Sequence, residues 1–352
     1  MESPKEQKAK HPGLWDSAGP RTKLFLIAAN LVSAGCLVWA LHDADIGRLG
    51  GEIRELDWRW VVLGIVADIA VYFFQGFRWS LLLRPITRAT LGQSVRAIYV
   101  GLFANEILPM RSGELIRCYL QARWAKLPFP VVLSSALIER VFDGIWLMAF
   151  FLVALRFTKL PGWADEFAYA LALLVLTLAG IIGVILLFRK QSEAWLLRAP
   201  ARAWKTKVYE IIEDLHAMGN SRTFFQAFLA SLPYLAMQVV PIYALLHAYG
   251  FEGPVLGPAA VMMLVLRLGT VVPSAPGNLG TFQLLAAQGL ALFIDDAAMA
   301  KRFSFLLWSL ITLPLLMGGF VAVALTGLGI RSLQREAQES SLGASSGATV
   351  KK

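Results

Sequence analysis

A series of long apolar runs constrains this chain more than any other feature. A bilayer core of about 30 Å requires roughly 20 apolar residues of helix to cross it. Lipid offers the backbone no hydrogen-bond partners, so crossing segments of this kind must be helical. The sequence therefore predicts an all-α polytopic integral membrane protein. Six runs are long enough for a full crossing: Leu24–Leu41, Trp60–Leu83, Val131–Leu155, Phe167–Phe188, Phe224–Tyr249 and Phe303–Ile330.

The composition supports a membrane protein and argues against nucleic acid as a partner. Of the 352 residues, 57% are hydrophobic and 16% are charged, whereas ordinary globular proteins have about 45–50% and about 25%. The net charge is +9, but the basic residues lie between the apolar runs. At those positions they set membrane topology and contact anionic headgroups.

Cysteine and histidine usage excludes several classes of site. The only cysteines are Cys36 and Cys118, and the four histidines are scattered without HExxH spacing. Disulfide scaffolds, thiolate metal sites and zinc hydrolase centres are therefore not expected. We expect neither a metal nor a cofactor.

Three stretches are too short or too broken to cross the membrane alone: Ser94–Met110, Gly257–Val272 and Thr281–Ile294. About 14 helical residues cover only about 21 Å. Helix breaks at membrane depth persist only where protein or water satisfies the freed backbone groups. The sequence predicts two re-entrant helical hairpins of opposite polarity, which makes eight or more apolar segments in total. The alternative is that the short runs also cross, with tilt and local bilayer thinning.

The distribution of basic residues predicts the orientation. The connection His42–Arg59 carries three Arg against five acids, whereas Arg189–Arg222 carries seven Lys and Arg against four acids. By the positive-inside rule the first is external and the second cytoplasmic. Both termini are then cytoplasmic, in the cell inner membrane. The predicted parts are a basic tail 1–23, a transmembrane domain 24–330 with a basic loop 189–223, and a disordered tail 331–352.

The first predicted hairpin is rich in polar residues, beginning with Asn105 and Glu106. Pro109 and Gly113 are expected to break the incoming helix, so that a new helix begins at Gly113-Glu114 with free N–H groups facing an anion. The side chains at i, i+3 and i+6 share one helical face. This pattern suits a phosphate site, or alternatively a satisfied ion-pair ladder at the interface. The three side chains on this face are Arg111, Glu114 and Arg117.

The run Val131–Leu155 contains Glu139, Arg140 and Asp143 close to the predicted midplane. Each charge at the centre of a span costs roughly 2.5–3.5 kcal/mol, so these side chains must pair or face a wet cavity. A neutral cluster that only fixes helix packing is one reading, and a functional site is the other. Potential cationic partners are Arg78, Arg96, Arg111 and Arg267.

The second predicted hairpin is interrupted by four turn-forming residues: Pro273, Pro276, Gly277 and Gly280. Prolines and glycines in this density make a stiff turn, and the returning helix is expected to begin at Thr281. No GxxxxGK[ST] motif is present, so a nucleotide site is not expected. Arg267, just before the turn, is a further candidate for binding a headgroup.

Four blocks of the sequence resemble one known family. They are Arg78-Trp79 with Leu81–Leu83, the segment Asn105–Arg117, the group Glu139-Arg140-x-x-Asp143, and the turn Pro273–Gly280. Together they resemble the flippase-like membrane region of lysylphosphatidylglycerol synthases of the MprF type, as a stand-alone member without the synthase domain. The resemblance implies an all-helical membrane fold with re-entrant elements. It also implies a role with aminoacylated phosphatidylglycerol or another polar lipid.

The leading functional hypothesis is a lipid flippase whose partners are membrane lipids: an anionic or aminoacylated phospholipid, or another polar lipid. The alternative is a membrane accessory protein that binds a polar lipid or a lipid-modifying enzyme without moving anything. An intramembrane enzyme is disfavoured, because the sequence reveals no nucleophile and base at a suitable spacing.

Overall fold

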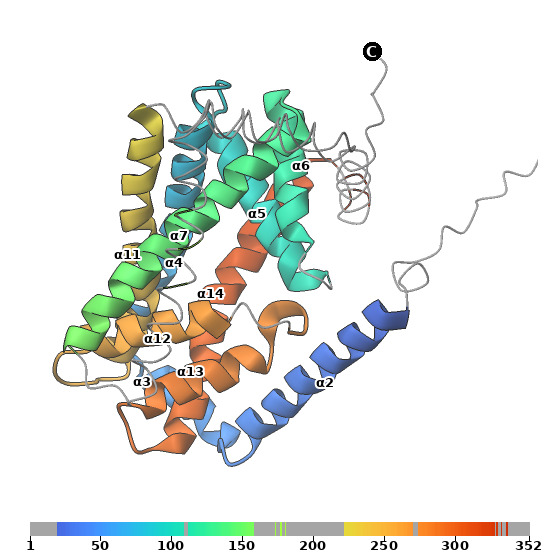
Figure 1. Ribbon diagram of the computed structural model, residues 1–352. Helices are drawn as coiled ribbons and strands as arrows, with labels where there is room; N and C mark the ends of the chain where they lie inside the picture. The colour runs from blue at the N-terminus through green and yellow to red at the C-terminus, as the bar shows by residue number, and fades with distance from the viewer. Residues whose placement is uncertain are drawn as a thin grey trace, which may run out of the picture.

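A computed structural model describes residues 20–108, 112–157, 173, 177, 180, 222–269, 274–327, 329, 332 and 336. Every regular element within these residues is helical (Figure 1). The elements are α2 (Pro20–Leu41), η1 (Ile46–Arg48), α3 (Leu49–Glu55), α4 (Trp58–Leu83), α5 (Leu91–Ile107), α6 (Gly113–Ala125), α7 (Phe129–Phe157), α11 (Arg222–Ala248), α12 (Leu256–Gly269), η3 (Pro276–Asn278), α13 (Thr281–Ala291) and α14 (Ala297–Ala324).

Three described helices are long and apolar enough to cross a membrane by themselves, namely α4, α11 and α14. The pair Ile27–Leu41 and Ile46–Glu55 passes the same test as one span bent by 70°. Helix α7 is 29 residues long but carries the predicted charge cluster. These helices confirm an all-helical integral membrane protein. The number of full crossings stays a prediction, since the expected span Phe167–Phe188 lies largely outside the described residues.

One predicted boundary is wrong. The last span was expected over Phe303–Ile330, but α14 begins at Ala297 and ends at Ala324. Asp296 caps its start by accepting a hydrogen bond from the Met299 N–H at 2.9 Å. The first two turns contain Lys301 and Arg302, both buried, and acceptors from the distant segment around α2 and α3 satisfy them. Lys301 Nζ donates to the His42 carbonyl at 2.6 Å, and Arg302 Nε donates to Glu52 Oε1 at 2.6 Å.

Helices α5 and α6 form a tightly packed hairpin. Thr90 and Gln93 cap the start of α5 reciprocally, and α6 begins at Gly113 as predicted. At the crossing, a Cβ on Gly113 would lie 1.8 Å from the Gly101 carbonyl oxygen, which no side chain could tolerate. The two helices have 17 and 13 residues, or about 26 and 20 Å.

Helices α12 and α13 form the second hairpin, joined through η3. Helix α13 begins at Thr281 as predicted, after Gly280 in the left-handed region at φ 89°. The turn is anchored from two sides, because Trp308 Nε1 donates to the Gly277 carbonyl at 2.9 Å and the Ala275 N–H donates to Ser33 Oγ at 2.8 Å. Both hairpins of the prediction are therefore present as helix pairs.

The end of α5 in the first hairpin meets the turn of the second hairpin. The end of α5 packs against η3, and Glu106 is the nearest side chain to the Cβ position of Gly277, at 3.5 Å. In Figure 1 the α5–α6 pair occupies the upper half and the α12–α13 pair the lower half, with α4, α11 and α14 running past both. The two hairpins thus occupy opposite halves of the bundle.

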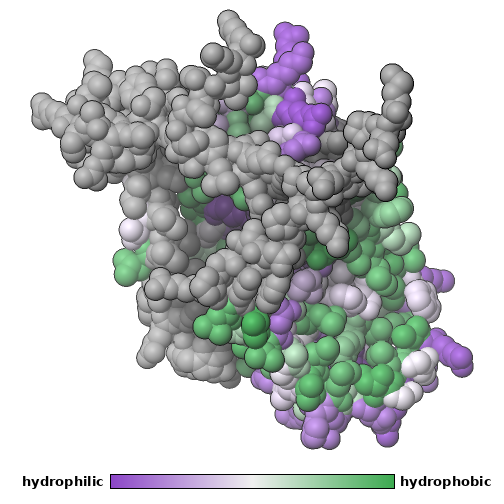
Figure 2. Space-filling view, turned by 90° about the vertical axis from the view of Figure 1, so that its right-hand side faces the viewer, coloured by the Kyte–Doolittle hydropathy of each residue, from purple (hydrophilic) through white to green (hydrophobic). Residues whose placement is uncertain are grey.

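The apolar core follows the same division. One buried cluster joins the first hairpin to α7, and another surrounds the second hairpin, while α4, α11 and α14 contribute to both. Figure 2 shows one face of the molecule, on which apolar side chains cover much of the lower half and hydrophilic ones gather at its bottom edge. This banding is what a lipid-facing surface with a polar rim requires.

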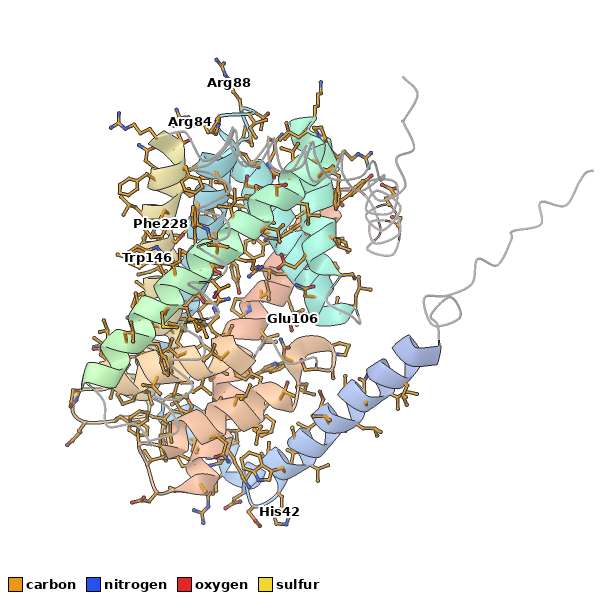
Figure 3. The ribbon with its side chains drawn as sticks, in the orientation of Figure 1. His42, Arg84, Arg88, Glu106, Trp146 and Phe228 are labelled. Carbon is orange, nitrogen blue, oxygen red and sulfur yellow. The ribbon has the colours of Figure 1, made fainter. Side chains whose placement is uncertain are left out.

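The polar connections at the two ends of α4 lie far apart. Figure 3 places His42 at the bottom of the molecule and both Arg84 and Arg88 at the top. Between them, Trp146 of α7 stacks on Phe228 of α11, with ring centroids 5.0 Å apart. The chain therefore passes from one end of the bundle to the other along α4.

Candidate functional site

Six charged side chains from three helices form a closed ring of alternating charge. We call it the charge ring. Its members, in order of contact, are Arg78 of α4, Glu139 of α7, Arg117 and Glu114 of α6, and Arg140 and Asp143 of α7. Three guanidinium groups face three carboxylates, so the ring has no formal net charge.

The contacts within the ring are short and mostly direct. Glu139 accepts from Arg78 Nη2 at 3.0 Å through Oε1 and from Arg117 Nη1 at 3.0 Å through Oε2. Glu114 accepts from Arg117 Nε at 2.8 Å and from Arg140 Nη2 at 2.6 Å. Asp143 closes the ring, bonding to Arg78 and lying 3.8 Å from Arg140 Nη1.

The ring has a dry side and an open side. The side chains of Arg78, Glu139 and Arg117 are 1–2% exposed, whereas those of Glu114 and Arg140 are 38% and 47% exposed. Charges removed from water are tolerated where ion pairs and hydrogen bonds compensate them. Among the described residues, Arg117 Nη2 is the one buried polar atom of these three side chains without a hydrogen-bond partner. The buried side therefore serves packing, and the open side remains available for binding.

Two arginines of the charge ring pack against aromatic side chains. The Arg78 guanidinium lies over the Tyr234 ring at 4.6 Å, and that of Arg117 lies over the Trp79 ring at 4.8 Å. Cation–π contacts of this kind stabilise a desolvated guanidinium. Trp79 is itself held by its indole N–H, which donates to Ser135 at 2.9 Å.

Beside the ring lies a cavity of about 470 Å³, which we call the central cavity. Its wall includes Glu114 and Arg140 from the open side of the charge ring. Other polar lining residues come from five further elements and are Asp68, Tyr72, Gln75, Asn105, Glu106, Tyr234, Gln238, Arg267 and Asn278. Its volume lies within the range of small-molecule sites.

Arg267 joins the second hairpin to the rest of the site. Its Nε donates to Gln238 Oε1 at 2.5 Å and its Nη2 donates to the Tyr234 hydroxyl at 2.7 Å. The same Tyr234 ring lies against Arg78, so one aromatic side chain touches arginines from α4 and α12. A movement of the second hairpin is thereby linked to the charge ring.

The structure brings most of the predicted site residues together. Asn105, Glu106, Glu114, Arg140 and Arg267 line the central cavity, and Asp143 lies beside it in the charge ring. Two glycines of the predicted hairpin turns, Gly277 and Gly280, are in left-handed conformations. Pro276 begins η3. Three predicted residues lie outside the described part of the chain: Pro109, Arg111 and Pro273.

Two predicted roles need correction. Arg117 was expected to hold a phosphate, but it is buried in the charge ring and does not line the cavity. Glu139, which was expected either to pair or to face a wet cavity, is paired with Arg78 and Arg117. The N-terminus of α6 was expected to offer a free N–H to an anion. The Asn105 side-chain oxygen instead accepts from the Gly113 N–H at 2.8 Å. Without this hydrogen bond, the buried N–H of Gly113 would have no partner.

The prediction missed three residues as site members. Arg78 was named only as a possible partner, although it is fully buried and binds two carboxylates. Its position within a 26-residue apolar helix is a signal that could have identified it. Tyr234 and Gln238, by contrast, are uncharged residues on an apolar helix, and only the fold reveals that they contact Arg267.

The chain is similar to known proteins over most of its length. The family model of the lysylphosphatidylglycerol synthase TM region matches residues 26–319. Glycosyltransferase AglD of Haloferax volcanii is 26% identical over 298 residues, covering 74% of this chain and 48% of AglD. The chain thus spans about half the length of that relative. No solved structure matches the chain significantly.

Two further relatives are similar over most of their own length. A UPF0104 membrane protein of Methanocaldococcus jannaschii is 21% identical over 251 residues, which is 64% of this chain and 74% of the relative. A UPF0104 membrane protein of Methanothermobacter thermautotrophicus is 24% identical over 249 residues, or 62% and 70%.

Proposed function

The chain belongs to the family of the lysylphosphatidylglycerol synthase TM region, and from this premise we propose that it is a lipid flippase rather than an enzyme. A polar headgroup enters the central cavity while the acyl chains stay in the bilayer, and the headgroup crosses between the leaflets of the cytoplasmic membrane. The observation that carries the proposal is a polar cavity, lined by Arg140 and Arg267, inside an apolar helical bundle.

The cavity wall suits a headgroup that contains a phosphate. Guanidinium groups bind phosphate oxygens through directed, charge-assisted hydrogen bonds. Arg140 faces the cavity from the exposed side of the charge ring, and Arg267 lines it from α12. Glu106 and Glu114 line the same cavity and offer acceptors for an ammonium group. An aminoacylated phospholipid, which carries both charges, matches this wall best.

The two hairpins provide the moving parts. They occupy opposite halves of the bundle, touch where the end of α5 packs against η3, and each has its own apolar core. Paired interrupted segments around a site at the midplane are typical of transporters that work by alternating access. If one hairpin and its apolar core rocked away from the other hairpin, the cavity would open to one leaflet at a time.

The test is movement of a lipid in reconstituted vesicles. Arg140→Gln and Arg267→Gln each remove a charged donor from the cavity wall, and a charge-assisted hydrogen bond contributes about 1.5–3 kcal/mol. We expect the initial rate of headgroup translocation at low lipid concentration to fall roughly tenfold to a hundredfold. Arg84→Gln is the matched control, because Arg84 is exposed at the end of α4, outside the cavity. Wild-type rates in both cavity variants would contradict the proposal.

A second candidate is a lipid-binding accessory protein that presents its lipid to a partner enzyme. It is favoured by one relative, which is named a glycosyltransferase and of which only 48% aligns with this chain. On this reading, purified protein alone binds the lipid, whereas headgroup movement or modification requires the added enzyme. Translocation by the purified chain would exclude it.

A further inference from the structure

One buried carboxyl group has no place in the charge ring. Asp68 lies eleven residues into the 26 residues of α4, is 4% exposed, and lines the central cavity. Its Oδ2 atom has no hydrogen-bond partner among the described residues. The three carboxylates of the charge ring, Glu114, Glu139 and Asp143, are each held by at least one arginine. Asp68 therefore requires a different explanation.

The groups around Asp68 offer little to stabilise a negative charge. Tyr72, one turn further along α4, hydrogen-bonds to the carboxyl group, and its ring packs at a tilt against that of Tyr99 of α5. Helix α14 contributes only Ile311 and Leu315 to the cavity wall. The other titratable or charged groups that line the cavity are Glu106 of α5, Glu114 of α6, Arg140 of α7, Tyr234 of α11 and Arg267 of α12.

The arginines of the charge ring and the cavity wall have contacts with other groups. Arg78, ten residues away on the same helix, binds Glu139 and Asp143. Arg267 and Arg140 contact α11 and Glu114 respectively. Among the described residues, no ion pair includes Asp68. An isolated carboxylate in a low-dielectric site takes up a proton instead of staying charged.

We propose that Asp68 is the proton-carrying residue of the protein and that its protonation is coupled to the movement of the cavity. This inference rests on the proposed function, because it supplies the energy source for lipid movement. When the cavity is closed, the O–H bond of Asp68 is intact and the side chain is neutral. When the cavity opens to water, that bond breaks and the proton passes to a water molecule, leaving a carboxylate.

The chemistry of the cavity favours a proton over a metal cation. Hard cations such as Ca²⁺ require six or more oxygen ligands at short range. In the described part of the chain, no three His, Cys, Asp or Glu side chains lie close enough to hold a metal ion. A single carboxyl group beside a cavity large enough for water needs only one water molecule to exchange a proton. Intramembrane acids in such settings serve as proton relays.

The first experiment examines the proton directly. Infrared spectroscopy separates the C=O stretch of a protonated carboxylic acid from the carboxylate bands in the purified full-length protein. We expect a protonated-acid band at neutral pH that is lost in Asp68→Asn. Asp57→Asn is the control, since Asp57 is an exposed N-cap of the same helix and Asn caps equally well. A band that survives Asp68→Asn, or no band in the wild type, would overturn the inference.

The variant should fold. Asn is close to isosteric with Asp, and Oδ2 of Asp68 makes no hydrogen bond that the substitution would remove. We expect Asp68→Asn to unfold thermally at or above the wild-type temperature. A large loss of thermal stability would indicate an undetected partner and would itself contradict an unpaired, neutral carboxyl group.

The second experiment measures coupling. Vesicles of phosphatidylcholine and phosphatidylglycerol, with a fluorescent-acyl phosphatidylglycerol probe, report leaflet distribution by dithionite quenching. For one proton per cycle, an imposed difference of one pH unit shifts the leaflet ratio by at most about tenfold. We expect this shift in the wild type and in Asp57→Asn, and its loss in Asp68→Asn.

The outcomes separate the two proposals. If the wild type moves no lipid, the flippase proposal fails and the infrared band alone decides whether Asp68 holds a proton. If the wild type moves lipid and Asp68→Asn keeps the response to the pH gradient, Asp68 is not the coupling residue. A response to a sodium gradient in place of a proton gradient would also overturn the inference.

Discussion

At the scale of residues, the charge ring shows how a membrane protein keeps six ionised groups at helix interfaces. Glu139 contacts two arginines at once, and each of those arginines also contacts a second carboxylate. A buried charge is costly when isolated, but it is tolerated when neighbours of opposite sign and hydrogen bonds satisfy it. Each member of the ring therefore depends on the others.

This dependence predicts that neutralising one buried member destabilises the protein strongly. In Glu139→Gln, Arg78 and Arg117 lose the carboxylate that they share while remaining buried. We expect the free energy of unfolding to fall by about 3–5 kcal/mol. The midpoint of thermal unfolding in detergent, followed by tryptophan fluorescence, measures this change.

The control for that experiment is Glu55→Gln. Glu55 is exposed at the end of α3, and exposed substitutions usually change stability by no more than about 0.5 kcal/mol. If the two variants were equally stable, the charge ring would not contribute to folding, and its arginines would be free to serve the cavity.

At the scale of elements, the hairpins are built on close backbone approaches. Gly113 and Gly101 let α5 and α6 touch, and Gly280 lets the start of α13 meet α2. The sequence predicted the breaks at Gly113 and Gly280 because proline and glycine interrupt helices for local steric reasons. It could not predict the start of α14, since the charges in the first two turns of that helix are satisfied by a distant segment.

Substitution at Gly280 is predicted to detach the second hairpin from α2. Its φ of 89° is strained for any residue with a side chain, and a Cβ there would lie 2.0 Å from the Ser33 carbonyl oxygen. The strain alone costs on the order of 1–3 kcal/mol. We expect Gly280→Ala to lower the thermal midpoint and to speed hydrogen exchange across α13.

Gly35→Ala is the matched comparison, because Gly35 lies on the same helix α2 and a Cβ there would meet nothing within 4 Å. Alanine in a helix interior is favoured over glycine by roughly 1 kcal/mol. This variant should be as stable as the wild type or more so. Equal exchange in both variants would mean that α13 and α2 do not depend on each other.

At the scale of the whole molecule, there are two apolar cores, one around each hairpin, and α4, α11 and α14 contribute to both. The hairpins touch where the end of α5 packs against η3. The positive-inside rule then predicts that the His42 end is external and the Arg84 end cytoplasmic. The second hairpin is expected to enter from the external side and to turn back at η3.

Cysteine labelling tests this topology. In a background lacking Cys36 and Cys118, single cysteines replace Glu252 and Asp295, which are exposed residues flanking the second hairpin. An impermeant thiol reagent should label both from the external side of intact cells. Ala275→Cys, at the tip, should not be labelled from the cytoplasmic side. Rapid cytoplasmic labelling at that position would show that α12 and α13 cross completely.

The sequence by itself determined the membrane environment, most of the helices, their breaks and the presence of charges at depth. Those properties follow from local chemistry. Lipid requires apolar helical runs, and the charged residues and helix breaks that interrupt such a run can be read directly from the sequence. Only the tertiary structure decided which charges pair. Arg78 and Asp143 are 65 residues apart, and their contact depends on how α4 and α7 cross. The same packing leaves Asp68 as the one carboxyl group in the described cavity wall with an unpartnered buried oxygen.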